Sequence, residues 1–161
     1  MISQNLYRDA LGRFASGVTI VTVAKDDGKV AGLTASAFSS LSLDPPLVLV
    51  CVKKMSAARV ALNTSSSFAV HILAENQKDL ALAFAKSSED KGDGVAWTLG
   101  SIGTPILEDF LVVLECLKFQ EFQGGDHSIL IGQVVDIRIS DCDRSPMTYY
   151  RGELNKLILK E

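Results

Sequence analysis

The order of apolar and polar residues predicts a chain built mainly of extended segments. Val135, Ile137 and Ile139 alternate with polar residues, as in a strand that has one face against a core. Runs rich in apolar or β-branched residues predict strands at residues 18–24, 29–33, 47–53, 67–73, 111–122 and 128–139. Between the first two, Asp26-Asp27-Gly28 is typical of a tight turn and predicts a hairpin.

Helical periodicity occurs in three short stretches. Apolar residues at helical spacing predict an amphipathic helix over residues 4–15 that lies on a sheet, and a short helix at 57–63 with Ser56 as a candidate cap. A third helix, capped by Asn76, has an apolar face of Leu80, Ala81, Phe84 and Ala85. Polar residues 86–94 predict a mobile loop. Strands in hairpin-like succession with few helices favour an antiparallel barrel in one domain, residues 1–161, over a Rossmann fold.

Composition and charge narrow the classes of function. The chain has 161 residues, 47% hydrophobic and 22% charged, with a net charge of −3, as in an ordinary globular protein. It has no Lys/Arg cluster to neutralise phosphates, which excludes a nucleic-acid partner. No apolar run reaches the roughly 18 residues that cross a bilayer, and the first residues lack the order of a secretory signal. We therefore expect a cytoplasmic protein without a membrane partner.

The cysteines and the small residues indicate which bonds and ligands the chain can form. Cys51, Cys116 and Cys142 are odd in number and widely spaced, which fits reduced thiols and neither a disulfide framework nor a metal site. Small and hydroxyl-bearing residues fill positions 32–46, immediately before the apolar run at 47–52. Their size leaves room for a flat ligand beside a buried strand. The alternative is a Ser/Thr-rich turn that makes only local hydrogen bonds.

Four segments of the chain resemble the flavin reductase family. They are residues 14–22, residues 32–38, residues 43–52, and Gly125-Asp126-His127 ahead of residues 132–134. The resemblance runs in the expected order from about Phe14 to Gly152. It implies a mainly β (α+β) fold, an antiparallel Greek-key split β-barrel of the FMN-binding type with a few short flanking helices. It also implies a homodimer in which NADH or NADPH reduces FMN, or FAD, and the reduced flavin leaves for a partner monooxygenase.

The resemblance carries a set of flavin-binding residues onto this chain. Along the ring edge and ribityl chain it places Thr34, Ala35, Ser36, Ser40 and Leu41. In a second segment it places Cys51, Val52, Lys53 and Ser56, with the flavin phosphate on Ser56 and on Lys53 rather than Lys54. Ala58 departs from the family pattern, because many relatives have a hydroxyl residue there. Two alternatives stay open: Ser56 caps the following helix, and Cys51 serves packing.

The same resemblance assigns the nicotinamide side of the site. It places His127 where the nicotinamide docks, and hydride transfer needs alignment of donor and acceptor rather than a general acid. His127 is thus a positioning residue, with a surface loop position as the alternative. Tyr150 and Arg151 would meet the pyridine nucleotide, or else pack at a barrel rim or dimer seam. His71 stands where relatives often have asparagine, and is either a neighbour of the flavin or a hydrogen-bonded core histidine.

Three functions are compatible with these residues. The first is an NAD(P)H:flavin oxidoreductase that supplies reduced flavin to a monooxygenase. The second is a flavoprotein that keeps its FMN and passes electrons to another acceptor. The third is a flavin or haem carrier without turnover that uses the same barrel. The residues do not decide between NADH and NADPH or between FMN and FAD.

Overall fold

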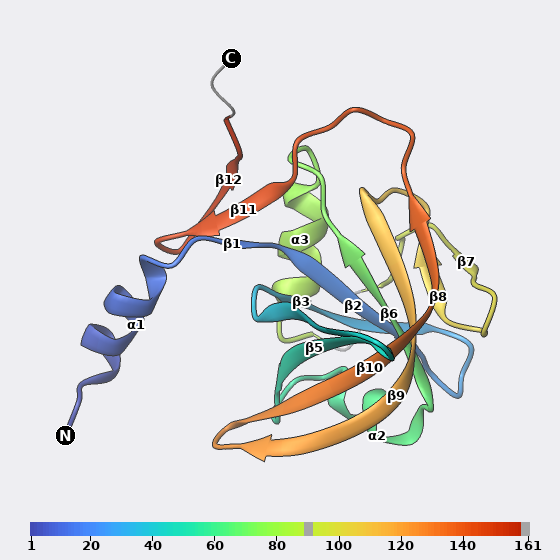
Figure 1. Cartoon of the computed structure of the whole chain (residues 1–161), viewed down its shortest axis with the longest axis horizontal. Helices are drawn as coiled ribbons and strands as arrows, with labels where there is room; N and C mark the ends of the chain where they lie inside the picture. The colour runs from blue at the N-terminus through green and yellow to red at the C-terminus, as the bar shows by residue number, and fades with distance from the viewer. Residues whose placement is uncertain (89–91, 159–161) are drawn as a thin grey trace.

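The computed structural model describes residues 1–88 and 92–158, and its body is one antiparallel sheet (Figure 1). The strand order is β3-β2-β6-β9-β10-β5-β4. The strands are β2 (Thr19–Ala24), β3 (Val30–Ala35), β4 (Phe38–Leu43), β5 (Pro46–Lys53), β6 (Ser67–Ile72), β9 (Val112–Gly124) and β10 (His127–Ile139). The sheet curls until residues of β3 and β5 share one core, so the prediction of an antiparallel split barrel is confirmed.

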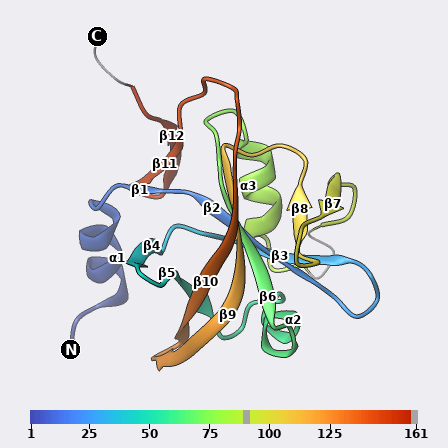
Figure 2. The ribbon, with the colours of Figure 1, turned by 45° about the vertical axis from the view of Figure 1, so that its right-hand side comes forward.

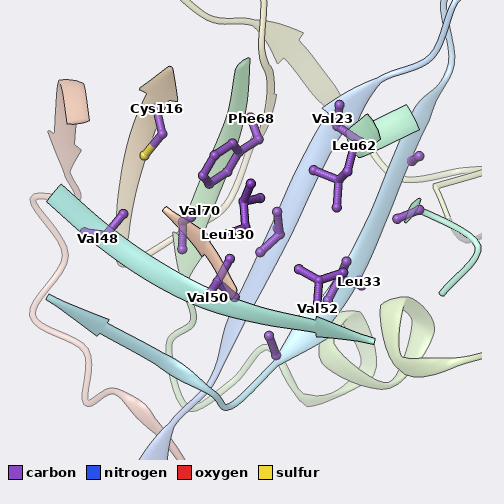
Figure 3. Close-up of a cluster of buried hydrophobic side chains, with 14 of the residues drawn as sticks. Val23, Leu33, Val48, Val50, Val52, Leu62, Phe68, Val70, Cys116 and Leu130 are labelled. Carbon is purple, nitrogen blue, oxygen red and sulfur yellow. The ribbon is translucent and has the colours of Figure 1, made fainter. Parts of the chain in front are cut away.

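The core lies inside this curl because alternate residues of its strands are apolar. Figure 3 shows Leu33 of β3 beside Val52 of β5, with Phe68 and Leu130 further along the same cluster. A second cluster lies on the other face of β2, where Ile20 packs with residues of the helix after β6. Strand β2 is therefore buried on both faces along nearly its whole length, as its run of apolar and threonine residues requires.

Two small sheets and three helices complete the fold. One sheet joins β1 (Ser16–Gly17), β11 (Met147–Tyr150) and β12 (Glu153–Lys156), and the other joins β7 (Trp97–Leu99) and β8 (Pro105–Leu107). The helices are α1 (Gln4–Gly12), α2 (Arg59–Thr64) and α3 (Lys78–Ala85). Across residues 1–88 and 92–158, none of the helices has the length and apolar character needed to span a membrane.

The first helix differs from its prediction in length and in position. It ends at Gly12 rather than near residue 15, with Arg13 as its C-cap. In Figure 1 it stands to the side of the sheet, and in Figure 2 it lies beyond the edge strand β4. It buries none of its residues, so the prediction that it lies on a sheet is wrong. Leu6 and Leu11 of its apolar face stay 62% and 56% exposed. Periodicity indicates an apolar face and not what covers it.

The caps of the other two helices also differ from the sequence interpretation. α2 begins at Arg59 rather than 57, and its N-cap Ala58 makes no side-chain hydrogen bond, so Ser56 is not its cap. α3 has Gln77 at the N-cap position, while the Asn76 amide oxygen accepts a hydrogen bond from Arg144. The predicted loop at 86–94 lies partly outside the described residues, which omit 89–91.

Candidate functional site

A cavity of about 360 Å³ opens where β3, β5 and the start of β10 meet the end of α3. We call it the polar cavity. It gathers seven residues proposed from the sequence: Thr34, Ala35, Ser36, Cys51, Lys53, Ser56 and His127. Neighbours of these residues and the end of α3 complete its wall: Leu33, Ala37, Met55, Ala57, Phe84, Ala85, Lys86 and Ser87. Its size lies within the range of about 300–1,000 Å³ that is usual for small-molecule sites.

Strand pairing brings the second flavin segment and the histidine together. β10 runs antiparallel to β5, with His127 opposite Lys53. Beyond the strand ends, the Lys54 amide donates to the Asp126 carbonyl at 3.0 Å, and the Ser56 amide donates to the Lys53 carbonyl at 3.0 Å. The turn after β5 and the turn before β10 are therefore fixed to each other by backbone hydrogen bonds.

The Ser56 hydroxyl is free to bind a ligand. Its Oγ is buried and has no hydrogen-bond partner in the described structure. A buried hydroxyl without a partner costs free energy, and such groups in native proteins call for a ligand or water. Lys53 lies exposed on the wall of the same cavity, whereas Lys54 does not line it. These positions fit an anionic group at this end of the cavity.

The small residues at 32–36 divide into two sets with different roles. A Cβ on Gly32 would lie 2.6 Å from Cε1 of Phe84, so α3, not a ligand, fills the space beside that glycine. The Thr34 hydroxyl donates to the Ala81 carbonyl of α3 at 2.6 Å, and its oxygen can then only accept from a ligand. Ala35 and Ser36 line the polar cavity. Only this second part of the segment provides the predicted room for a flat molecule.

His127 is oriented by its neighbour Asp126. Nδ1 of His127 lies 2.8 Å from Oδ1 of Asp126, which leaves Nε2 for another partner. The hydrogen bond from His127 lowers the pKa of the Asp126 carboxyl below its ordinary value. The His127 side chain is 43% exposed, so it is open to solvent and to the polar cavity at once.

Five of the proposed site residues lie elsewhere. Ser40 and Leu41 are exposed on β4, where the pairing with β5 is irregular, and the Val52 side chain is fully buried in the core. Arg151 lines a wider cavity of about 1030 Å³, in which Tyr149 rather than Tyr150 takes part. Tyr150 is instead stacked with Arg151, whose guanidinium carbon lies 5.5 Å from the ring centroid.

The wide cavity adjoins the polar cavity. It lies between α1 and the strands β4 and β5, and Ser36, Ala37 and Cys51 line both cavities. Cys51 is half-buried at this junction. The backbone amide of Arg151 donates to the Gly12 carbonyl at 2.8 Å, which fixes the β11–β12 turn against the end of α1.

His71 is a core histidine. It is fully buried, its Nδ1 donates to the Ile20 carbonyl at 3.2 Å, and its Nε2 accepts from the Leu107 amide at 3.1 Å. Burial lowers its pKa to about 4, so the ring is neutral at physiological pH. It lines neither cavity, and the core alternative is therefore the correct one. In the described ranges no three His, Cys, Asp or Glu side chains cluster as metal ligands would.

Lys86 and Ser87 are the polar residues of the cavity wall that sequence reasoning missed. They follow the last residue of α3 and reach the cavity because α3 packs on β3. Their place depends on the contact between a small residue, Gly32, and a large one, Phe84, which the structure shows. Nothing in the sequence pattern ties these two positions together.

The sequence model of the family described as "Flavin reductase like domain" matches residues 11–157. The chain belongs to this flavin reductase family. Among curated relatives, the "Probable flavin reductase" of Rhizobium meliloti is 45% identical over 127 residues, which are 79% of this chain and 41% of that protein. The reductase component of the flavin-dependent trigonelline monooxygenase of Acinetobacter baylyi is 40% identical over 145 residues, 90% of this chain and 46% of that protein. This chain thus spans less than half the length of these two relatives.

Solved structures of flavin reductases share the fold. The NADH:FAD oxidoreductase of Streptomyces globisporus, solved in complex with NAD and FAD fragments, superimposes with a TM-score of 0.89 at 35% identity. The match covers 97% of this chain and 93% of that one. Family membership and fold therefore agree with the resemblance drawn from the sequence.

Proposed function

We propose that this chain is an NAD(P)H-dependent flavin reductase, which passes hydride from NADH or NADPH to FMN, or FAD, and releases the reduced flavin. The observation that carries this proposal is the polar cavity, where residues 34–36, the turn at 53–56 and His127 converge from three strands. Membership of the flavin reductase family supports the same reaction.

The cavity wall suits the two ends of a flavin. An isoalloxazine ring is flat and needs close approach of the backbone, which the small side chains of Ala35 and Ser36 permit. The phosphate end needs donors and positive charge. Ser56 offers a buried hydroxyl without a partner, and Lys53 offers an ammonium group.

The flavin and the nicotinamide supply the redox chemistry, and the chain supplies their alignment. Hydride transfer requires the two rings to stack at contact distance with the reacting atoms opposed. In this proposal His127, oriented by Asp126, positions the nicotinamide at the edge of the polar cavity. Arg151 lines the adjoining wide cavity and would meet the nucleotide diphosphate there.

A homodimer and a monooxygenase partner belong to the same proposal. Leu6, Leu11 and Phe14 in and beside α1 are 62%, 56% and 79% exposed, and Leu43 on β4 is 96% exposed. Such a group of exposed apolar residues, together with the wide cavity beside α1, favours cover by a second copy of the chain. Light scattering at micromolar concentration is expected to give the mass of a dimer, and a Leu11→Arg variant that of a monomer.

The three free cysteines fit a cytoplasmic location.

Steady-state kinetics tests the reaction. The purified chain should consume NADH or NADPH in proportion to added FMN or FAD. Absence of turnover with all four pairs would refute the proposal. Gel filtration after mixing with FMN separates a diffusing substrate, which is lost, from the resident cofactor of the second alternative, which stays bound in stoichiometric amount.

A further inference from the structure

The end of α3 brings a second lysine to the polar cavity. Lys86 follows α3 directly, and it lines the cavity together with Lys53 from the end of β5. α3 is fixed to β3 in two ways, by the hydrogen bond from Thr34 to Ala81 and by the Phe84 ring packed on Gly32. The position of Lys86 relative to the cavity is therefore set by the folded barrel.

The charge of the cavity wall has one sign. Lys53 and Lys86 are the charged residues that line it, and within residues 1–88 and 92–158 no Asp or Glu does. The salt bridges of these same ranges include neither lysine. The whole chain carries a net charge of −3, so this local excess of positive charge opposes the overall balance. A cavity lined by one sign of charge concentrates ligands of the other sign.

We propose that Lys86 and Lys53 together bind the terminal phosphate of the flavin and make FMN the preferred flavin over FAD and riboflavin. This inference rests on the proposed function, because it takes the polar cavity as the flavin site. A phosphate monoester carries about −1.5 to −2 charges at pH 7 on one phosphorus, which two ammonium groups can share. Riboflavin has no phosphate, and FAD spreads its charge over two phosphates that lead to an adenosine.

Cavity size also favours the smaller flavin. The volume of about 360 Å³ lies near the lower end of the range for ligand sites, about 300–1,000 Å³. The adenosine half of FAD would have to extend beyond the polar cavity.

Fluorescence titration of FMN, FAD and riboflavin tests the assignment without requiring turnover. We expect the unsubstituted chain to bind FMN most tightly. Lys86→Ala should weaken FMN binding about tenfold or more, because a hydrogen bond to a charged group contributes at least that much, and leave riboflavin binding unchanged. Lys86→Arg should keep most of the FMN affinity. Lys78→Ala, at the exposed first residue of the same helix and away from the cavity, removes the same charge and should change nothing.

The possible results separate this inference from the proposed function. If Lys53→Ala weakens FMN binding and Lys86→Ala does not, the paired role of Lys86 is wrong and the reductase proposal stands. Equal losses for FMN and riboflavin in Lys86→Ala, or tighter binding of FAD than FMN, also overturn it. If FMN binds with the expected lysine dependence but no nucleotide is consumed, the reductase proposal fails and the phosphate site stands. If the unsubstituted chain binds no flavin, both are wrong.

Discussion

Nδ1 of His127 lies 2.8 Å from Oδ1 of Asp126 at the turn between β9 and β10, and the His127 side chain lines the polar cavity. The carboxylate fixes the imidazole so that Nε2 is available to a ligand. Asp126→Asn keeps the shape of the side chain and removes its charge. We expect a several-fold higher KM for the nucleotide with unchanged FMN affinity, measured by steady-state kinetics and fluorescence titration. A loss of FMN affinity with unchanged KM would show that the pair serves the flavin instead.

The packing of α3 on β3 makes Gly32 irreplaceable. An added Cβ would lie 2.6 Å from the Phe84 ring and 2.8 Å from the Val21 carbonyl oxygen, which cannot move without disturbing the sheet. Gly32→Ala should lower the free energy of unfolding by about 1–3 kcal/mol, as overpacking does. Gly17→Ala is the matched control, because nothing lies within 4 Å of its added Cβ. Urea denaturation that gave equal stability for both variants would contradict the close approach of α3.

Burial of His71 predicts a loss of stability at acid pH. The pKa of His71 is lowered from 6.5 to about 4, so between these values the unfolded chain binds a proton that the folded chain does not. Stability should therefore fall as the pH is lowered through this range, by up to about 3 kcal/mol from this group.

Replacement of His71 separates its contribution to the pH dependence of stability from that of other groups. In a His71→Asn variant the difference in unfolding free energy between pH 7 and pH 4 should be smaller than in the unsubstituted chain. Denaturation curves at several pH values measure this difference. Parallel pH profiles for the two proteins would mean that His71 is not the titrating group.

Glu115 is a buried carboxylate that organises the loop between β7 and β8. It accepts hydrogen bonds from the Ser101 amide at 2.8 Å and the Thr104 hydroxyl at 2.6 Å, and it pairs with Arg138 at 3.1 Å. Burial alone would raise the pKa of Glu115, but the bonds from Thr104, Ser101 and Ile102 bring it below its ordinary value. Charge loss in Glu115→Gln should cost about 3 kcal/mol of stability, because it leaves donors unmatched. Arg138→Met, at a side chain 41% exposed, should cost less, because Glu115 keeps its hydrogen bonds from Ser101 and Thr104. A larger loss there than at Glu115 would contradict this assignment.

Periodicity predicted the barrel because its central strands carry strong signals. β2 and β6 are continuous buried runs, and β10 alternates toward its end. β4 was missed because its sequence, Phe38–Leu43, is rich in serine and mostly exposed, which resembles a loop. β11 and β12 have four residues each, and β11 pairs with β1 from the other end of the chain. Such pairings depend on contacts that local patterns do not contain.

The site was predictable only in part, because local patterns locate strands but not the contacts between distant segments. Residues 34–36 and the turn at 53–56 lie beside strands that the pattern located, and the family resemblance identified them as one site. Lys86 could not be assigned to the polar cavity from the sequence, because its position depends on how α3 packs on Gly32. His71 could be placed in the core only once its partners, Ile20 and Leu107, were known.

A crystal structure of the chain with FMN would show whether the polar cavity is the flavin site. We expect the isoalloxazine ring against Ala35 and Ser36, with the phosphate in contact with Ser56 and Lys53 and one ring face open toward His127. Flavin bound elsewhere, with the polar cavity closed by the protein's own side chains, would contradict it.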